Sequence, residues 1–222
     1  MRIRRVSLMV AVGAAVAALA LSAGACSNGS SGLPAQSPGS SASAAPASAF
    51  GVAIIKRFGI SIRVPLGWAS AAATAKPGDK SGGPLLVATW ADPKGKQVAG
   101  HYLDALQIMV FELNKPAAPT DVAVHPNDFK AIGREMIAEE IGTKQQVSIS
   151  DPFKPITLNG TSGLQVTYSY LVGSTPTGAM SYLLPKGRYA YWITGQASAA
   201  TWSTAWSKLA PAMSSFTIKK IA

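Results

Sequence analysis

The hydrophobic pattern divides the chain into three parts. Ser7–Leu21 is an uncharged apolar run, residues 27–49 are almost all Ser, Ala, Gly and Pro, and short patterned segments follow from Phe50 onwards. Period-two alternation predicts strands with one buried face, and apolar residues spaced three or four apart predict amphipathic helices. The third part mixes both patterns, which predicts one α+β domain over residues 50–222.

Strand patterns dominate the first half of this domain. Residues 54–64 alternate between β-branched and polar positions, which predicts a strand ended by Pro65. Residues 85–90 predict a second strand. Residues 101–113 fit either a strand or a helix, and we favour a strand.

The clearest helix pattern covers residues 127–141, with Asn127 as the expected N-cap and Gly142 as the expected C-cap. Its apolar stripe is typical of a helix that packs on a sheet. The polar face is expected to be solvated, and a docking surface is the alternative. That face carries Lys130, Arg134, Glu135, Glu139 and Glu140.

A run of strand signals follows this helix. Pro185-Lys186-Gly187 predicts a hairpin turn between the last two strands. Short connections favour antiparallel pairing. The expected strands are 156–158, 164–172, 179–184 and 188–194.

The last helix is predicted over residues 199–210, with Ser198 as N-cap and Pro211 as the residue that ends it. Trp202 and Trp206 share its apolar stripe. A pair of tryptophans can form a ligand platform, but a sheet needs a helix to cover its face, so we expect them to belong to the core. The whole pattern predicts an antiparallel β-sheet covered by helices.

The N-terminus has the three regions of a secretory signal over residues 1–25: a basic head, an apolar run and small residues. The run of about fifteen residues is shorter than the roughly 20 that a spanning helix needs. The alternative is a helix that is not cleaved and remains as an anchor. Arg4-Arg5 also leaves twin-arginine export open.

The segment Ala23-Gly24-Ala25-Cys26 resembles the lipobox of bacterial lipoproteins, and Cys26 is the only cysteine. This resemblance implies cleavage before Cys26 and a diacylglyceryl group on its sulfur. Two acyl chains are enough for stable anchoring. The mature protein is therefore expected at the outer face of the cytoplasmic membrane, held to it by lipid on Cys26.

Residues 26–49 follow as the lipidated cysteine and a linker. The linker has no charge and too few large apolar residues to offset the entropy of ordering it, which predicts disorder. As a flexible coil, about 23 residues would average roughly 25 to 30 Å from end to end. The linker would therefore act as a tether between the membrane and the domain.

The domain also resembles PsbP-like domains and the LpqN-type lipoproteins of actinobacteria. The resemblance rests on the opening Ile60–Trp68 with its Pro-Leu-Gly-Trp end, on Leu158–Val166 as a turn into a long strand, and on Ser215-Phe216 after the last helix. It implies an α/β/α sandwich used for binding and assembly. It supplies no catalytic residues.

The residues that could carry chemistry form no recognised catalytic or metal-binding motif. His101 and His125 have no neighbours at metal-ligand spacing. Residues 160–163 lack the Gly-x-Ser-x-Gly spacing of a nucleophile elbow. We therefore expect no enzyme activity, no metal and no cofactor, and a hydrolase with a dispersed site remains the alternative.

The charge of the chain is unevenly distributed. The net charge is +10, and it is +7 without the three arginines of the signal. Residues 104–151 hold eight acidic and four basic residues, or −4, which leaves +11 for the rest of the mature chain. This asymmetry predicts attraction to anionic lipid or acidic cell-wall polymers. The alternative is that the lysines only keep the domain soluble, and export argues against a nucleic-acid partner.

Two functions fit these patterns best. The first is a non-catalytic binding or assembly module of the cell envelope, with another envelope protein or an anionic polymer as partner. The second is a carrier of lipid or a small molecule, because binding pockets are often lined by aromatic rings. The candidate ligand or partner surface consists of Tyr168, Tyr170, Tyr182, Tyr189, Tyr191 and Trp192.

Overall fold

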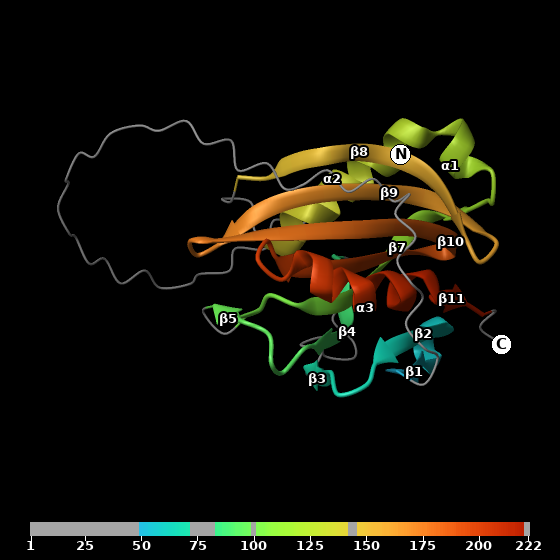
Figure 1. The fold of residues 1–222 in the computed structure, drawn as a ribbon. Helices are drawn as coiled ribbons and strands as arrows, with labels where there is room; N and C mark the ends of the chain where they lie inside the picture. Colours follow the sequence, from blue (N-terminus) through green and yellow to red (C-terminus); the bar gives the residue numbers. More distant parts are fainter. Residues whose placement is uncertain (1–48, 72–82, 99–100, 142–145, 220–222) are drawn as a thin grey trace, which may run out of the picture.

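The centre of the domain is a six-stranded antiparallel sheet (the main sheet) with the strand order β3-β4-β7-β10-β9-β8 (Figure 1). The structure is a computed structural model that describes residues 49–71, 83–98, 101–141 and 146–219. The strands of the main sheet are β3 (Ala69–Ala71), β4 (Leu85–Ala91), β7 (Ala105–Ala117), β8 (Ser148–Leu158), β9 (Thr161–Val172) and β10 (Thr175–Ser198).

Strand β10 folds back on itself at Gly187, where φ is 58°. A straight strand of 24 residues would be about 80 Å long, yet Ser181 Oγ and Thr194 Oγ1 lie 2.8 Å apart. The arm before Gly187 pairs with β9, and the arm after it pairs with β7. The predicted hairpin at Pro185-Lys186-Gly187 is therefore confirmed.

A second sheet of three strands (the small sheet) has the order β1-β2-β11. It contains β1 (Phe50–Ile55), β2 (Ile60–Pro65) and β11 (Thr217–Ile218), with the 3-10 turn η2 (Lys56–Phe58) between β1 and β2. The prediction of one strand over 54–64 is wrong, because the chain reverses at Gly59, which adopts a left-handed conformation with φ 64°. A short pair, β5 (Gln97–Val98) and β6 (His101–Tyr102), completes the strands of the described residues.

The remaining strand predictions hold, with longer bounds. The ambiguous segment 101–113 is extended, since β6 and β7 cover most of it. Residues 148–155 join the predicted 156–158 to form β8, whose two prolines are tolerated because β8 is an edge strand. The β8–β9 turn has positive φ at Asn159 (47°) and Gly160 (78°), as expected for a tight Asn-Gly hairpin.

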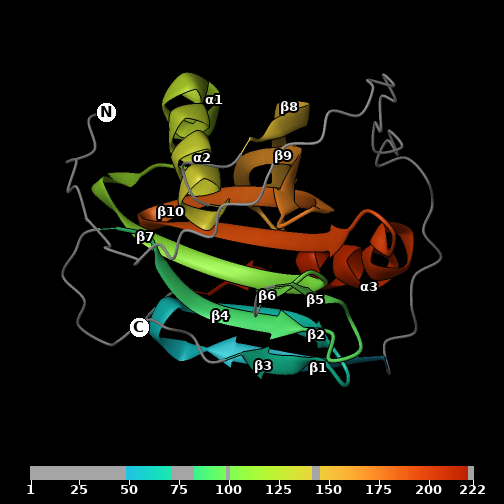
Figure 2. The ribbon, with the colours of Figure 1, turned by 90° about the vertical axis from the view of Figure 1, so that its left-hand side faces the viewer.

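The described residues form three α-helices: α1 (Asp121–Val124), α2 (Pro126–Ile141) and α3 (Trp202–Ser214). Figure 2 shows α2 on one side of β7 and β10, with α3 and the small sheet on the other. The predicted helix-covered sandwich is thus correct for the α2 side only. On the second side a sheet shares the cover with a helix.

Each side of the main sheet has its own hydrophobic core. The α2 side packs Phe129, Met136 and Ile137 against the main sheet, and the α3 side packs Leu209 and Met213 together with the small sheet. The small sheet contributes Ile60, Ile62 and Val64 to the second core. Burial on both faces explains why nearly every residue in the two arms of β10 is apolar or hydrogen-bonded.

The predicted helix starts are wrong by one residue for α2 and by three residues for α3. Helix α2 begins at Pro126, so Asn127 lies in its first turn, and proline is favoured there because the first N–H needs no partner. Helix α3 has Thr201 as N-cap rather than Ser198. Ser198 instead lies before the helix, where its Oγ accepts a 3.2 Å hydrogen bond from Thr201 N.

Pro211 does not end α3 as predicted, since the helix continues to Ser214. The residues that follow it, Ala212 and Met213, are 0% exposed against the main sheet. Their burial outweighs the helical hydrogen bond that proline cannot make.

Within the described residues, no helix has both the length and the apolar character to cross a membrane. The predicted signal over residues 1–25, the lipidation site Cys26 and almost all of the tether lie outside this part of the chain, as does Gly142.

Candidate functional site

The six aromatic residues proposed as one surface lie on two sides of the main sheet. Tyr168, Tyr170 and Trp192 belong to the α2-side core, and Tyr182 and Tyr191 belong to the other core. These five are at most 9% exposed. The prediction of a shared ligand or partner surface is therefore wrong.

Tyr189, the sixth ring, is half-buried on the small-sheet side, where its ring centroid lies 5.7 Å from that of Phe58. Sequence could not separate these roles, since alternation identifies opposite faces of a strand but does not show that both are covered. A carrier function therefore loses the aromatic pocket that motivated it.

The α2-side rings converge on the carboxyl group of Glu140, near the C-terminal end of α2. Its Oε2 accepts hydrogen bonds from Tyr168 Oη at 2.8 Å, Trp192 Nε1 at 2.9 Å and Thr194 Oγ1 at 3.1 Å. Ser181 Oγ joins Tyr168 and Thr194 at 3.1 and 2.8 Å. We call these five residues the Glu140 network.

The carboxyl of Glu140 is enclosed, although the residue as a whole is partly exposed. Its Oε1 has no hydrogen-bond partner among the described residues. Burial raises the pKa of this carboxyl above its ordinary value, and the three donated hydrogen bonds oppose part of the rise. Burial and the nearby Glu140 charge also raise the pKa of Tyr168.

The prediction that Glu140 lies on the solvated face of its helix is wrong. Position 140 lies four residues after Met136 and three after Ile137, both of which are buried. Residues with that spacing share a helix face, so the stripe of α2 already included position 140. The signal was present, but the charge of Glu140 concealed it.

The Glu140 network ties α2 to the arms of β10 and to β9. The hydroxyl groups of the network donate to the carboxylate or to each other, and no histidine or other base lies beside them in the network. The described residues also contain no cluster of three or more His, Cys, Asp or Glu suitable for a metal. The arrangement is suited to holding a helix on a sheet.

The second unusual feature is the outer face of the small sheet. Val52 and Ile54 are 67% and 64% exposed, which is unusual for large apolar side chains that lie two positions apart on one strand. Val52 and Ile54 alternate on β1, and Val52 pairs with the exposed Arg63 of β2. We call this surface, together with the exposed Lys56 and Arg57 that follow β1, the β1 face.

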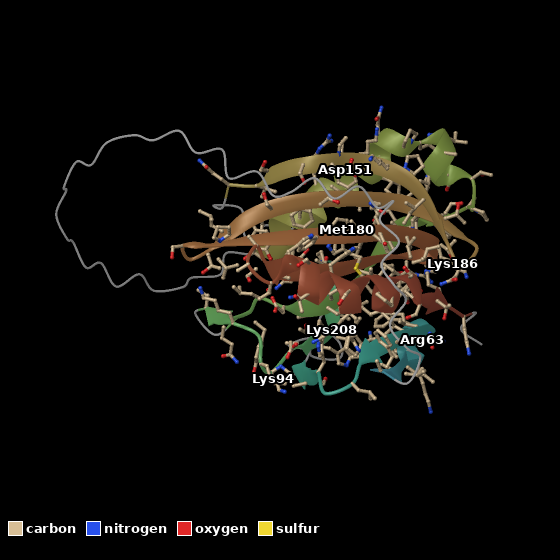
Figure 3. All side chains as sticks on the ribbon, in the orientation of Figure 1. Arg63, Lys94, Asp151, Met180, Lys186 and Lys208 are labelled. Carbon is tan, nitrogen blue, oxygen red and sulfur yellow. The ribbon has the colours of Figure 1, made fainter. Side chains whose placement is uncertain are left out.

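The two sides of the molecule also differ in charge. Residues 49–71 contain three basic and no acidic residues, whereas α1 and α2 carry most of the acidic residues of segment 104–151. Figure 3 shows Arg63 at the small sheet and Asp151 at the opposite side of the domain. The β1 face is therefore both apolar and basic, and it lies away from the acidic helices.

The fold and these two features describe a sheet domain with a closed core on each side of the main sheet and one open face. No family model matches the chain, and no curated protein matches it. Solved structures do resemble it.

The solution structure of cyanobacterial PsbP (CyanoP) from Synechocystis sp. PCC 6803 gives a TM-score of 0.55 at 14% identity, covering 77% of this chain and 93% of CyanoP. A crystal structure from Bacteroides thetaiotaomicron gives 0.44 at 11% identity, covering 76% and 48%. LpqN, described as involved in cell envelope biogenesis of Mycobacterium tuberculosis, gives 0.40 at 14% identity, covering 72% and 83%. The CyanoP comparison confirms the predicted PsbP-like fold, and at this identity it shows the fold alone.

Proposed function

We propose that this chain is an exported lipoprotein that acts as a non-catalytic binding module at the outer face of the cytoplasmic membrane. Lipid on Cys26 anchors it, and the β1 face is its docking surface. The observation that carries the proposal is the exposure of Val52 and Ile54 on β1. This strand is followed by Lys56 and Arg57, and Val52 pairs with Arg63. An apolar patch with a polar rim is typical of an interaction site.

The position of the β1 face in the chain supports the same function. Strand β1 begins at Phe50, directly after the predicted tether. A lipid on Cys26 would keep the membrane within about 24 residues of this strand, and a tethered module reaches a nearby partner at a high effective concentration. The envelope partners that fit a basic apolar face are anionic lipid, acidic polymers and acidic envelope proteins.

The anchor is tested by replacing Cys26 with Ala. We expect the variant to leave the membrane fraction, because two acyl chains provide stable anchoring and the sulfur is their attachment point. The measurement is sedimentation of membranes followed by immunodetection. Retention of the variant in membranes would show that Ser7–Leu21 is the anchor instead.

The docking surface is tested with a photo-crosslinking amino acid at position 52 in cells. The matched control places it at Ala131, which is exposed on α2 on the opposite side of the main sheet. We expect crosslinked products from position 52 and few from position 131. Equal yields at the two positions would contradict a dedicated β1 face.

A further inference from the structure

The β1 face has an unusual combination of geometry and exposure. Its register places Ala53 opposite Ile62 and Val52 opposite Arg63, so the inner side of the small sheet is apolar and buried. The outer side carries Val52 and Ile54 in solvent. A sheet with one covered face normally alternates apolar inside with polar outside, and β1 breaks that rule.

The basic residues around this apolar strip are free to contact a ligand. Lys56, Arg57 and Arg63 are exposed, and none forms an ion pair with a described residue. The Arg57 guanidinium lies 5.1 Å from the centre of the Phe58 ring, which leaves its N–H groups available. The exposed Lys219 directly follows β11, and its backbone N–H donates to the Gly59 carbonyl at 2.8 Å.

The position of the strand favours a lipid surface over a soluble partner. The β1 face begins at the first described residues, at the end of the chain that the proposed lipid would hold to the bilayer. Exposed aliphatic side chains flanked by Lys and Arg are the composition of protein surfaces that lie in the headgroup region of anionic membranes. The acidic helices α1 and α2 lie on the other side of the main sheet, so this orientation keeps them away from anionic lipid.

We propose that the β1 face binds the anionic bilayer to which the chain is anchored, with Val52 and Ile54 in the headgroup region and the basic residues on lipid phosphates. This inference rests on the proposed function, because it names the partner of the same face. Docking gives the domain one fixed orientation: the small sheet faces the lipid, and α2 faces away from it.

The experiment uses the full lipidated chain in vesicles. Cys26 is the only cysteine, so a cysteine introduced by Ile54→Cys is the one thiol left for an environment-sensitive fluorophore. The control is Ala131→Cys on α2. The vesicles contain phosphatidylcholine with phosphatidylglycerol, or phosphatidylcholine alone, and the readout is quenching by nitroxide lipids and by aqueous iodide.

We expect the label at position 54 to be quenched by nitroxide lipids and shielded from iodide in anionic vesicles, and the label at position 131 to behave oppositely. Each basic residue near an anionic surface contributes roughly a fivefold preference. Changing Lys56, Arg57 and Arg63 together to Gln should therefore lower the ratio of docked to undocked protein roughly 100-fold. High salt should lower the same ratio by a smaller factor, because it screens the attraction to anionic lipid.

Equal quenching at positions 54 and 131 in anionic vesicles would overturn the proposal. Shielding of position 54 in native membranes but not in protein-free vesicles would also overturn it, since the occupant would then be a protein. Mass spectrometry of the purified chain shows whether Cys26 carries lipid, independently of the quenching measurement. Without lipid on Cys26 the proposed anchor fails, while quenching at high vesicle concentration still decides whether the β1 face binds lipid.

Discussion

The α2 side of the main sheet and the outer face of the small sheet differ in how far their side chains are covered. On the α2 side even a carboxylate is enclosed and receives three hydrogen bonds, and the aromatic rings around it are buried. On the small-sheet side, large aliphatic residues remain in solvent although polar residues would suit the position. The α2 side is therefore closed by contacts within the domain, whereas the outer face of the small sheet is the contact surface that we propose.

The strongest test of this contrast is Trp192→Ala on the α2 side. Trp192 is 1% exposed and donates to Glu140 Oε2, so its truncation should lower the free energy of unfolding by about 3–5 kcal/mol. Urea denaturation followed by circular dichroism measures this. The control Val124→Ala truncates an exposed side chain. If Trp192→Ala lowered the free energy of unfolding as little as the control, the ring would not have the core role that we assign to it.

The Glu140 network should give the next largest effect. Glu140→Ala leaves three buried donors without their acceptor, which should cost about 1–3 kcal/mol. The neighbouring Glu139→Ala is the matched control, because Glu139 is exposed and its loss should change stability by less than about 0.5 kcal/mol. Similar losses at both positions would show that the network does not hold α2.

The pH dependence of stability tests the buried carboxyl directly. The pKa of Glu140 is raised in the folded state, so between the unfolded and folded pKa values the folded protein keeps a proton that the unfolded chain has released. The contribution of this carboxyl to folding stability is therefore fully present below the unfolded pKa of about 4.3 and is lost as pH rises through the raised folded pKa. The melting temperatures of the wild type and Glu140→Gln are measured from acid to neutral pH. As pH rises, the melting temperature of the wild type should fall relative to that of the variant. A constant difference would contradict the assignment.

The smallest expected effect is on the open side. Ile54→Ser should change the free energy of unfolding by no more than about 0.5 kcal/mol, because the side chain is already 64% exposed. Thermal unfolding of the two proteins in detergent provides the comparison. A loss above about 1 kcal/mol would mean that β1 is closed by contacts within the domain, and the contrast between the two sides would disappear.

Much of this fold follows from short-range pattern. Residues 164–172 and the Asn159-Gly160 turn identify β9 and its hairpin, because alternation and turn chemistry are local properties. The apolar stripe of α2 was equally clear. The reversal at Gly59 was missed, because the apolar residues on both sides of it continue the same alternation.

The sites were harder to predict because they depend on distant residues. Three of the residues that enclose the Glu140 carboxyl lie 28 to 54 positions further along the chain, and no local pattern brings them together. The β1 face was missed for the opposite reason. An apolar strand predicts burial, and only the three-dimensional arrangement shows that nothing in the described residues covers its outer side.

The pairing of β11 with β2 also sets an order of folding. Thr217 pairs with Ser61 and Ile218 with Ile60, so the small sheet joins residues from both ends of the domain. The hairpins of β8, β9 and β10 need only nearby residues and can form early, whereas contacts between distant positions form slowly. In a chain exported from its N-terminus, β1 and β2 emerge before the rest of the domain but pair with β11 only after the intervening strands and helices have emerged. The side that we propose faces the lipid is therefore the last part of the domain to be completed.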